Sequence, residues 1–232
     1  MENLPLYIAA TFGITVLLTI WLFSRATHYA KPILIFLSVL TVVQSVLGLS
    51  GFYNDPHTMT ARFPMLVIPL TIFCIALFLT AKGWAFIDSL DIKILTILHI
   101  IRIPVEITLF WLFVHQAIPQ AMTFEGRNYD ILSGLSAPLV YYFGFVKKQL
   151  TKTVLIIWNV ACMLLLINVV ASAVLSLPAR FQNFGFEQPN IAVGYFPFLL
   201  LPAILVPLVL FANAAAIRQL IYNKNIILKN SK

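Results

Sequence analysis

The stretch ILHIIRIPVEI, residues 97–107, places three ionisable side chains inside an otherwise apolar run. In a helix, at about 100° and 1.5 Å per residue, His99, Arg102 and Glu106 fall on one face near the middle of the run. An isolated charge at the centre of a bilayer costs at least about 2.5–3.5 kcal/mol. If the run crosses a membrane, this face must therefore meet protein or water rather than lipid.

The composition indicates that the chain does enter a membrane. Hydrophobic residues make up 61% of the 232 residues and charged residues only 10%, far from the balance of a soluble domain. The net charge of +7 does not indicate a nucleic-acid partner, because the basic residues lie between apolar runs. The sequence predicts an all-α, polytopic membrane protein whose main partner is the lipid bilayer.

A transmembrane helix needs about 20 predominantly apolar residues to cross the hydrocarbon core. Seven runs approach this length, and the fifth is the shortest. We predict a single seven-helix transmembrane domain over residues 1–232. The expected spans are 4–24, 32–50, 65–81, 94–116, 132–147, 153–177 and 198–222.

The distribution of Lys and Arg predicts the orientation, because basic residues near helix ends are retained on the cytoplasmic side. Of the 15 Lys and Arg residues, eleven fall in connections on one side, three on the other, and Arg102 lies within a span. We expect the N-terminus outside and the C-terminus in the cytoplasm, in a cell membrane of the bacterial inner-membrane type. The first span lacks the basic segment and the cleavage site of a signal peptide, so we expect it to be retained.

Two segments indicate an internal repeat as an alternative to seven unrelated helices. FPMLVIP (63–69) and FPFLLLP (196–202) share Phe, Pro, Leu and Pro at identical spacing. A 3+1+3 parallel repeat of this kind occurs in some transporters. The layout resembles that of the SWEET sugar transporters, but the Pro-Gln signature of that wider group occurs only at 119–120, in a predicted loop. The sequence therefore assigns no family.

The two charges of the opening stretch are predicted to pair with each other. Arg102 and Glu106 are four residues apart, a spacing at which opposite charges meet along a helix. Pro104 removes a backbone hydrogen bond between them and is expected to kink the helix. In the functional interpretation, Glu106, tuned by Arg102 and His99, exchanges a proton or anchors a polar solute. In the structural alternative, the ion pair only fixes the helix in the bundle.

Polar residues of other spans are expected to complete a polar interior. Gln44 and Asn213 would each be costly facing lipid. We predict that they take part in a solute site; the alternative is that each only holds the bundle through interhelical hydrogen bonds. Pro197, Pro202 and Pro207 predict irregular backbone in the outer half of the last span.

The predicted outer loops hold a second candidate region, a metal site. Carboxylates and imidazoles are common metal ligands, although their spacing here matches no compact motif. The candidate ligands are Asp55, His57, His115, Glu125, Asp130 and Glu187. No other cofactor is expected.

The sequence thus favours a protein that binds or transports a small-molecule solute through a polar intramembrane site, with proton coupling. A metal-dependent membrane enzyme with its site at the outer-face loops is one alternative. A structural or assembly subunit is the other. Homo-oligomerisation is left open, and enzyme activity is less favoured because no nucleophile lies near a histidine and an acid in the sequence.

Overall fold

The computed structural model describes residues 4–222, except for the side chains of residues 56, 57, 59 and 60. Within this part the regular secondary structure is entirely helical. Six helices are long and apolar enough to cross a membrane, and one further apolar helix, Ile131–Val146, is shorter. The seven predicted spans correspond to these six helices and the shorter one, so the chain is a helical, multi-pass membrane protein in its architecture.

The elements run in the following order, with η marking 3₁₀ and π-helical segments. They are α1 (Leu6–Ala26), α2 (Lys31–Leu49), α3 (Pro56–Leu79), α4 (Ala81–Ser89), α5 (Ile92–Leu98), η1 (His99–Ile101), α6 (Arg102–Val114), η2 (Gln120–Met122), α7 (Ile131–Tyr141), η3 (Tyr142–Val146), α8 (Lys152–Leu175), η4 (Ala192–Gly194), η5 (Leu201–Leu205) and α9 (Val206–Tyr222).

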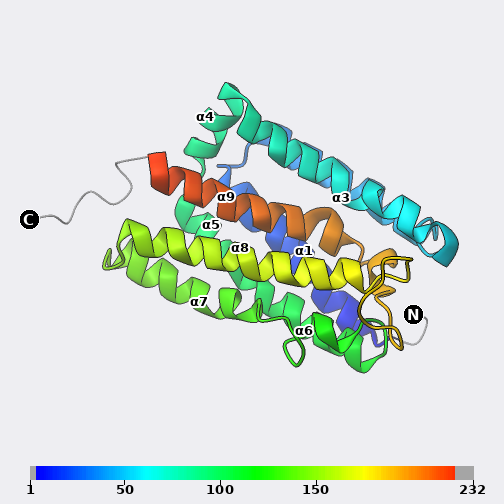
Figure 1. Cartoon of the computed structure of the whole chain (residues 1–232). Coiled ribbons are helices and arrows are strands. Elements are labelled where there is room, and N and C mark those ends of the chain that lie inside the picture. The colour runs from blue at the N-terminus through cyan, green and yellow to red at the C-terminus, as the bar shows by residue number, and fades with distance from the viewer. Residues whose placement is uncertain (1–3, 223–232) are drawn as a thin grey trace, which may run out of the picture.

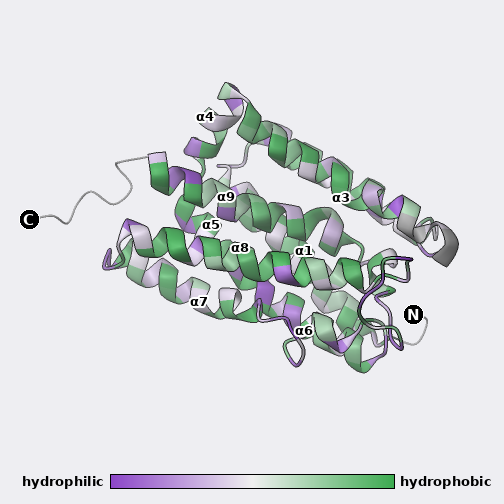
Figure 2. Cartoon of the chain, viewed as in Figure 1, coloured by the Kyte–Doolittle hydropathy of each residue, from purple (hydrophilic) through white to green (hydrophobic). Residues whose placement is uncertain are grey.

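The long helices run up and down a single bundle with α9 near its centre (Figure 1). α9 packs against α8, α5 and α3, and α1 packs against α5 and α6. α3 and α8 lie on two sides of α9 rather than against each other (Figure 1). Figure 2 shows hydrophobic residues along the helices and hydrophilic residues mainly at their ends and in the connections.

Basic residues gather at one end of the bundle. Arg25 lies in the last turn of α1, Lys31 begins α2, Lys152 begins α8 and Arg218 lies near the end of α9. We call this the basic end and the opposite one the loop end, where the N-terminal end of α1 lies (Figure 1). The positive-inside rule predicts that the basic end is cytoplasmic. Three of the lysines counted for this prediction lie outside the described residues.

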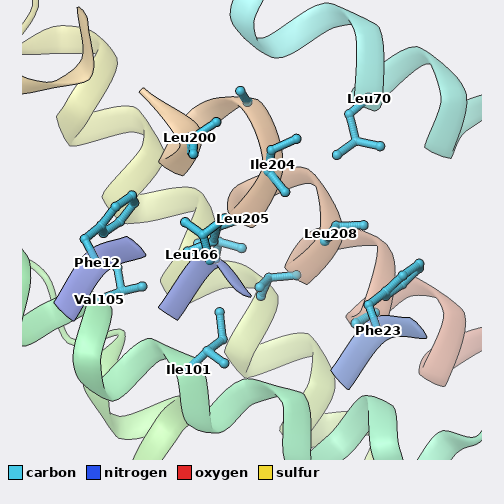
Figure 3. Close-up of a cluster of buried hydrophobic side chains, with 14 of the residues drawn as sticks. Phe12, Phe23, Leu70, Ile101, Val105, Leu166, Leu200, Ile204, Leu205 and Leu208 are labelled. Carbon is cyan, nitrogen blue, oxygen red and sulfur yellow. The ribbon is translucent and has the colours of Figure 1, made fainter. Parts of the chain in front are cut away.

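The centre of the bundle is a continuous apolar core. Phe12 of α1, Val105 of α6, Leu166 of α8 and Leu205 of η5 all lie within it, and Figure 3 shows these side chains converging from four helices. Burial of such side chains stabilises a packed structure by about 25 cal/mol per Å² of apolar surface removed from water. Inside a membrane the same residues act through close packing instead.

α3 begins earlier than the sequence predicted. The predicted span starts at residue 65, whereas α3 starts at Pro56 and contains both Pro64 and Pro69. A proline frees the carbonyl four residues before it, which for Pro69 is that of Met65. Gln44 of α2 donates a hydrogen bond from Nε2 to this carbonyl at 3.0 Å. The side-chain amide therefore satisfies the acceptor that the proline leaves free, and the helix continues.

α7 is too short to cross a membrane alone. α7 has 11 residues and η3 has 5. Together they form about 24 Å of helix, which is shorter than the hydrocarbon core of about 30 Å. α7 begins inside the bundle, beside η1 and α6. The segment 115–130 fills the length of the bundle that α7 leaves open, because this segment returns from the loop end into the bundle (Figure 1). Irregular backbone at this depth is tolerated where protein covers it.

The last span is irregular near the loop end, as the prolines predicted. Leu201–Leu205 form a π-helical segment that contains Pro202, and regular α9 continues from Val206. The π-helical turn widens the backbone there, a geometry often found at functional sites. This arrangement does not test the parallel repeat, which stays a prediction.

Candidate functional site

The three ionisable residues of the opening stretch lie in the interior of the bundle. The exposed fractions of His99, Arg102 and Glu106 are 1%, 2% and 1%. The prediction that this face meets protein rather than lipid is confirmed. The helix also changes form here, since η1 separates α5 from α6 directly before Arg102.

The predicted ion pair between Arg102 and Glu106 is wrong. Arg102 forms its salt bridge with Asp130, the residue directly before α7. Its Nη1 also donates a hydrogen bond to the Cys162 carbonyl of α8 at 3.0 Å. Side chains lean toward the N-terminus of a helix, so the order Arg before Glu is the less favourable one for pairing. Arg102 thus reaches across to α7 and α8 and connects three helices.

Glu106 has a neutral partner instead. Asn128 donates a hydrogen bond from Nδ2 to Glu106 Oε2 at 2.6 Å. The same Nδ2 contacts the Met122 carbonyl at 3.0 Å, and Asn128 Oδ1 accepts from the backbone N–H of Asp130 at 2.9 Å. Asn128 therefore fixes the segment before α7 and delivers one hydrogen bond to the carboxylate of α6.

A close helix contact brings these groups together. A Cβ atom built on Gly134 of α7 would lie 2.8 Å from Ile103 Cγ1 and 3.1 Å from the Ile103 backbone nitrogen. A larger side chain would push α7 away from α6. Ser133, beside this glycine, donates a hydrogen bond to Asp130 Oδ1 at 3.3 Å. The glycine thus allows the start of α7 to lie against Arg102.

The charges of this cluster do not balance. Arg102 supplies one positive charge, whereas Asp130 and Glu106 supply two carboxylates, and all three side chains are buried. Among the described residues, no second Lys or Arg forms a salt bridge with either carboxylate. With both carboxylates ionised, the cluster carries one uncompensated negative charge. Such a charge is costly in an apolar interior, so a proton or a bound cation is needed to neutralise it.

Both carboxylates line a cavity of about 130 Å³. Its walls come from the first half of α3, from α6, from the last half of α8, and from η5 with the start of α9. Glu106 and Asp130 are the only ionisable residues among its lining side chains. The cavity therefore places an apolar space directly beside the excess negative charge.

His99 packs beside the cluster without a hydrogen bond of its own. Its ring meets Trp158 of α8 edge-on, with 5.4 Å between ring centroids. Neither ring nitrogen has a hydrogen-bond partner within the described part of the chain. Asn213 of α9 is fully buried and equally unpartnered there, whereas Gln44 connects α2 with α3 and accepts from the Tyr53 hydroxyl at 2.8 Å. Gln44 lies outside the cavity lining.

Within the part of the chain that the structure describes, the predicted metal ligands do not come together. Asp130 is buried beside Arg102, while Asp55, His115, Glu125 and Glu187 are exposed. The side chain of His57 lies outside the described residues. Among the residues described, no group of three or more His, Cys, Asp and Glu side chains could hold a metal ion.

Sequence reasoning expected Asp130 in an outer loop and did not predict the contact of Asn128 with Glu106. A signal was present in the length of the fifth span, because 16 apolar residues are too few to cross the core. If one end of a short span reaches the membrane surface, its other end lies within the membrane, and so do the residues next to that end. Asn128 and Asp130 precede this span.

Comparisons with protein-family models, curated proteins and solved structures find no match to this chain.

Proposed function

We propose that the protein binds or transports a small solute within the membrane, and that Glu106 is the group that exchanges a proton or a cation as the solute binds. The observation that carries this proposal is the unequal pairing of the two carboxylates. Both line the cavity. Among the described residues, Asp130 has the guanidinium of Arg102 as its partner, whereas Glu106 has only the amide of Asn128.

The chemistry follows from this inequality. A carboxylate that shares a full positive charge is held in its ionised form and is a poor site for exchange. A carboxylate with a neutral donor beside an apolar cavity is most stable with a proton, or with a cation that replaces the proton. The exchange of one for the other couples solute binding to proton movement.

The test uses protein in zwitterionic lipid nanodiscs and a series of protonated amines: methylamine, hexylamine and dodecylamine. We expect at least one amine to raise the unfolding temperature of the wild type, and to bind Glu106→Gln about 10- to 100-fold more weakly, because a charge-assisted hydrogen bond is lost. Glu125→Gln, which removes an exposed carboxylate, is the matched control.

Two results would overturn this function. One is the absence of any amine that distinguishes wild type from Glu106→Gln. The other is an equal loss of amine binding in Glu125→Gln, which would show that general surface charge controls the response. Either result would leave the buried cluster with a structural role alone.

A further inference from the structure

We propose that the solute is a single-chain amphiphile with a protonated amine head, which binds with its head at Glu106 and its chain in the apolar groove between α3 and α8. This inference rests on the proposed function and names its substrate class.

The lining excludes a solute that is hydrophilic throughout. Fourteen of the sixteen lining residues are apolar, and the other two are Glu106 and Asp130. A polar group that enters such a space loses its hydration without gaining hydrogen bonds, at a cost of a few kcal/mol. Only the part of the solute that meets the carboxylates can be polar, and the remainder must be apolar.

The size of the cavity limits what it can enclose. A volume of about 130 Å³ corresponds to about four water molecules, at about 30 Å³ each in the liquid. This is room for an amine with a few carbon atoms, less than the 300–1,000 Å³ or so of ordinary ligand sites. A longer chain must continue outside the enclosed part.

A second cavity provides that continuation. It has a volume of about 320 Å³ and lies between α3 and α9, with Met163 of α8 at its edge. The first cavity meets Leu201, Pro202 and Val206. The second meets Pro207, Leu210, Phe211 and Ala214. The two spaces therefore follow each other along η5 and α9, where α3 and α8 flank α9 (Figure 1).

The route into this groove is lateral. Phe63, Val67, Val170 and Ala173 line the first cavity and are partly exposed on the sides of α3 and α8. In a membrane these sides face the acyl chains. An alkyl chain moves from lipid into the groove without crossing water, so the head group decides the affinity among amphiphiles of equal chain length.

The charge of the cluster selects the head. The excess negative charge of the buried cluster calls for a positive partner, and an ammonium group donates hydrogen bonds to a carboxylate as well as neutralising it. An alcohol of equal length would supply a hydrogen bond without the charge. A carboxylate or sulfate head would add to the excess and be rejected.

The experiment measures thermal unfolding in nanodiscs with dodecylamine, dodecanol and methylamine. Dodecylamine and dodecanol are compared at equal concentration in the membrane, and methylamine is added at the same concentration in water. We expect dodecylamine at saturation to raise the unfolding temperature by about 5–10 °C. Dodecanol and methylamine should each have less than a tenth of its apparent affinity. Equal binding of methylamine would overturn the amphiphile but leave the proposed function standing, and equal binding of dodecanol would overturn the amine head.

Two alanines of α8 provide a matched pair for the groove. Ala173 lines the first cavity, whereas Ala171 is exposed outside it. Ala173→Phe should weaken dodecylamine binding at least tenfold, and Ala171→Phe should leave it unchanged. Unchanged binding in both variants, with each folded as shown by its unfolding temperature without ligand, would overturn the groove. Binding that fails in Glu106→Gln but survives in Ala173→Phe would place the head correctly and the chain elsewhere.

Discussion

Asp130 and Glu106 are two carboxylates of one buried cluster with very different partners. Asp130 shares the positive charge of Arg102 and connects α6 with α7, whereas Glu106 accepts one hydrogen bond from the neutral Asn128. Both are at most 3% exposed. The difference teaches that burial alone does not identify a functional carboxylate, and that the distribution of the counter-charge does.

The largest effect should come from breaking the charged pair. Arg102→Ala leaves Asp130 as an uncompensated buried charge and should lower the free energy of unfolding by roughly 3–5 kcal/mol. Adding Asp130→Ala should restore a large part of this loss. The measurement is a double-mutant cycle of unfolding in mixed micelles. A coupling energy larger for Arg102 with Glu106 than with Asp130 would contradict the pairing seen here.

The next effect concerns the helix contact that positions Asp130. Gly134→Ala places a methyl group against Ile103 and should cost about 1–3 kcal/mol of stability through overpacking. Gly13→Ala in α1 is the matched control, since a Cβ at that position meets nothing within 4 Å. It should be neutral or slightly stabilising, because alanine favours a helix more than glycine does. Equal destabilisation in both variants would mean that α7 is not held closely at Gly134.

An effect of at most this size should follow from removing the neutral partner of Glu106. Asn128→Ala takes away the hydrogen bonds to Glu106 and to the backbone N–H of Asp130, and should cost about 1–3 kcal/mol. Asn168→Ala removes a hydrogen bond to the Arg127 carbonyl at an exposed position and should cost about 1 kcal/mol or less. Unfolding curves show which of the two variants loses more stability. A larger loss in Asn168→Ala than in Asn128→Ala would contradict a tightly formed cluster.

The smallest effect should come from a polar pair without charge. Tyr53 donates to Gln44, and burial raises the pKa of its phenol above the ordinary value of 10.0. Tyr53→Phe should cost about 1 kcal/mol at neutral pH.

The raised pKa gives this pair a pH dependence with a definite sign. The unfolded state ionises first, so the contribution of the neutral phenol is complete below about pH 10 and falls as the pH rises through the folded pKa. Tyr53→Phe should therefore flatten the alkaline fall in stability. A wild type and a variant with identical alkaline profiles would show that Tyr53 is not buried in this way.

The sequence predicted the features that depend on local spacing. The burial of His99, Arg102 and Glu106 followed from their common helix face, and the irregular start of the last span followed from its prolines. Both depend on a period or on a missing backbone donor, which are properties of one segment of chain.

The sequence could not predict contacts between segments. Asp130 reaches Arg102 because the chain from 115 to 130 turns back into the bundle and because Gly134 permits close packing. Gln44 satisfies the carbonyl freed by Pro69. Neither arrangement leaves a periodic pattern, since each depends on which helices become neighbours.

The most direct test of the account is the infrared spectrum of the protein in nanodiscs, in the region of the carbonyl stretch of protonated carboxylic acids. We predict a protonated carboxyl band in the wild type without ligand, its absence in Glu106→Gln, and its loss when dodecylamine replaces the proton. A band that remains unchanged in Glu106→Gln would contradict the assignment of Glu106 as the exchanging group. A wild type without such a band would contradict proton binding at Glu106, on which the proposed exchange depends.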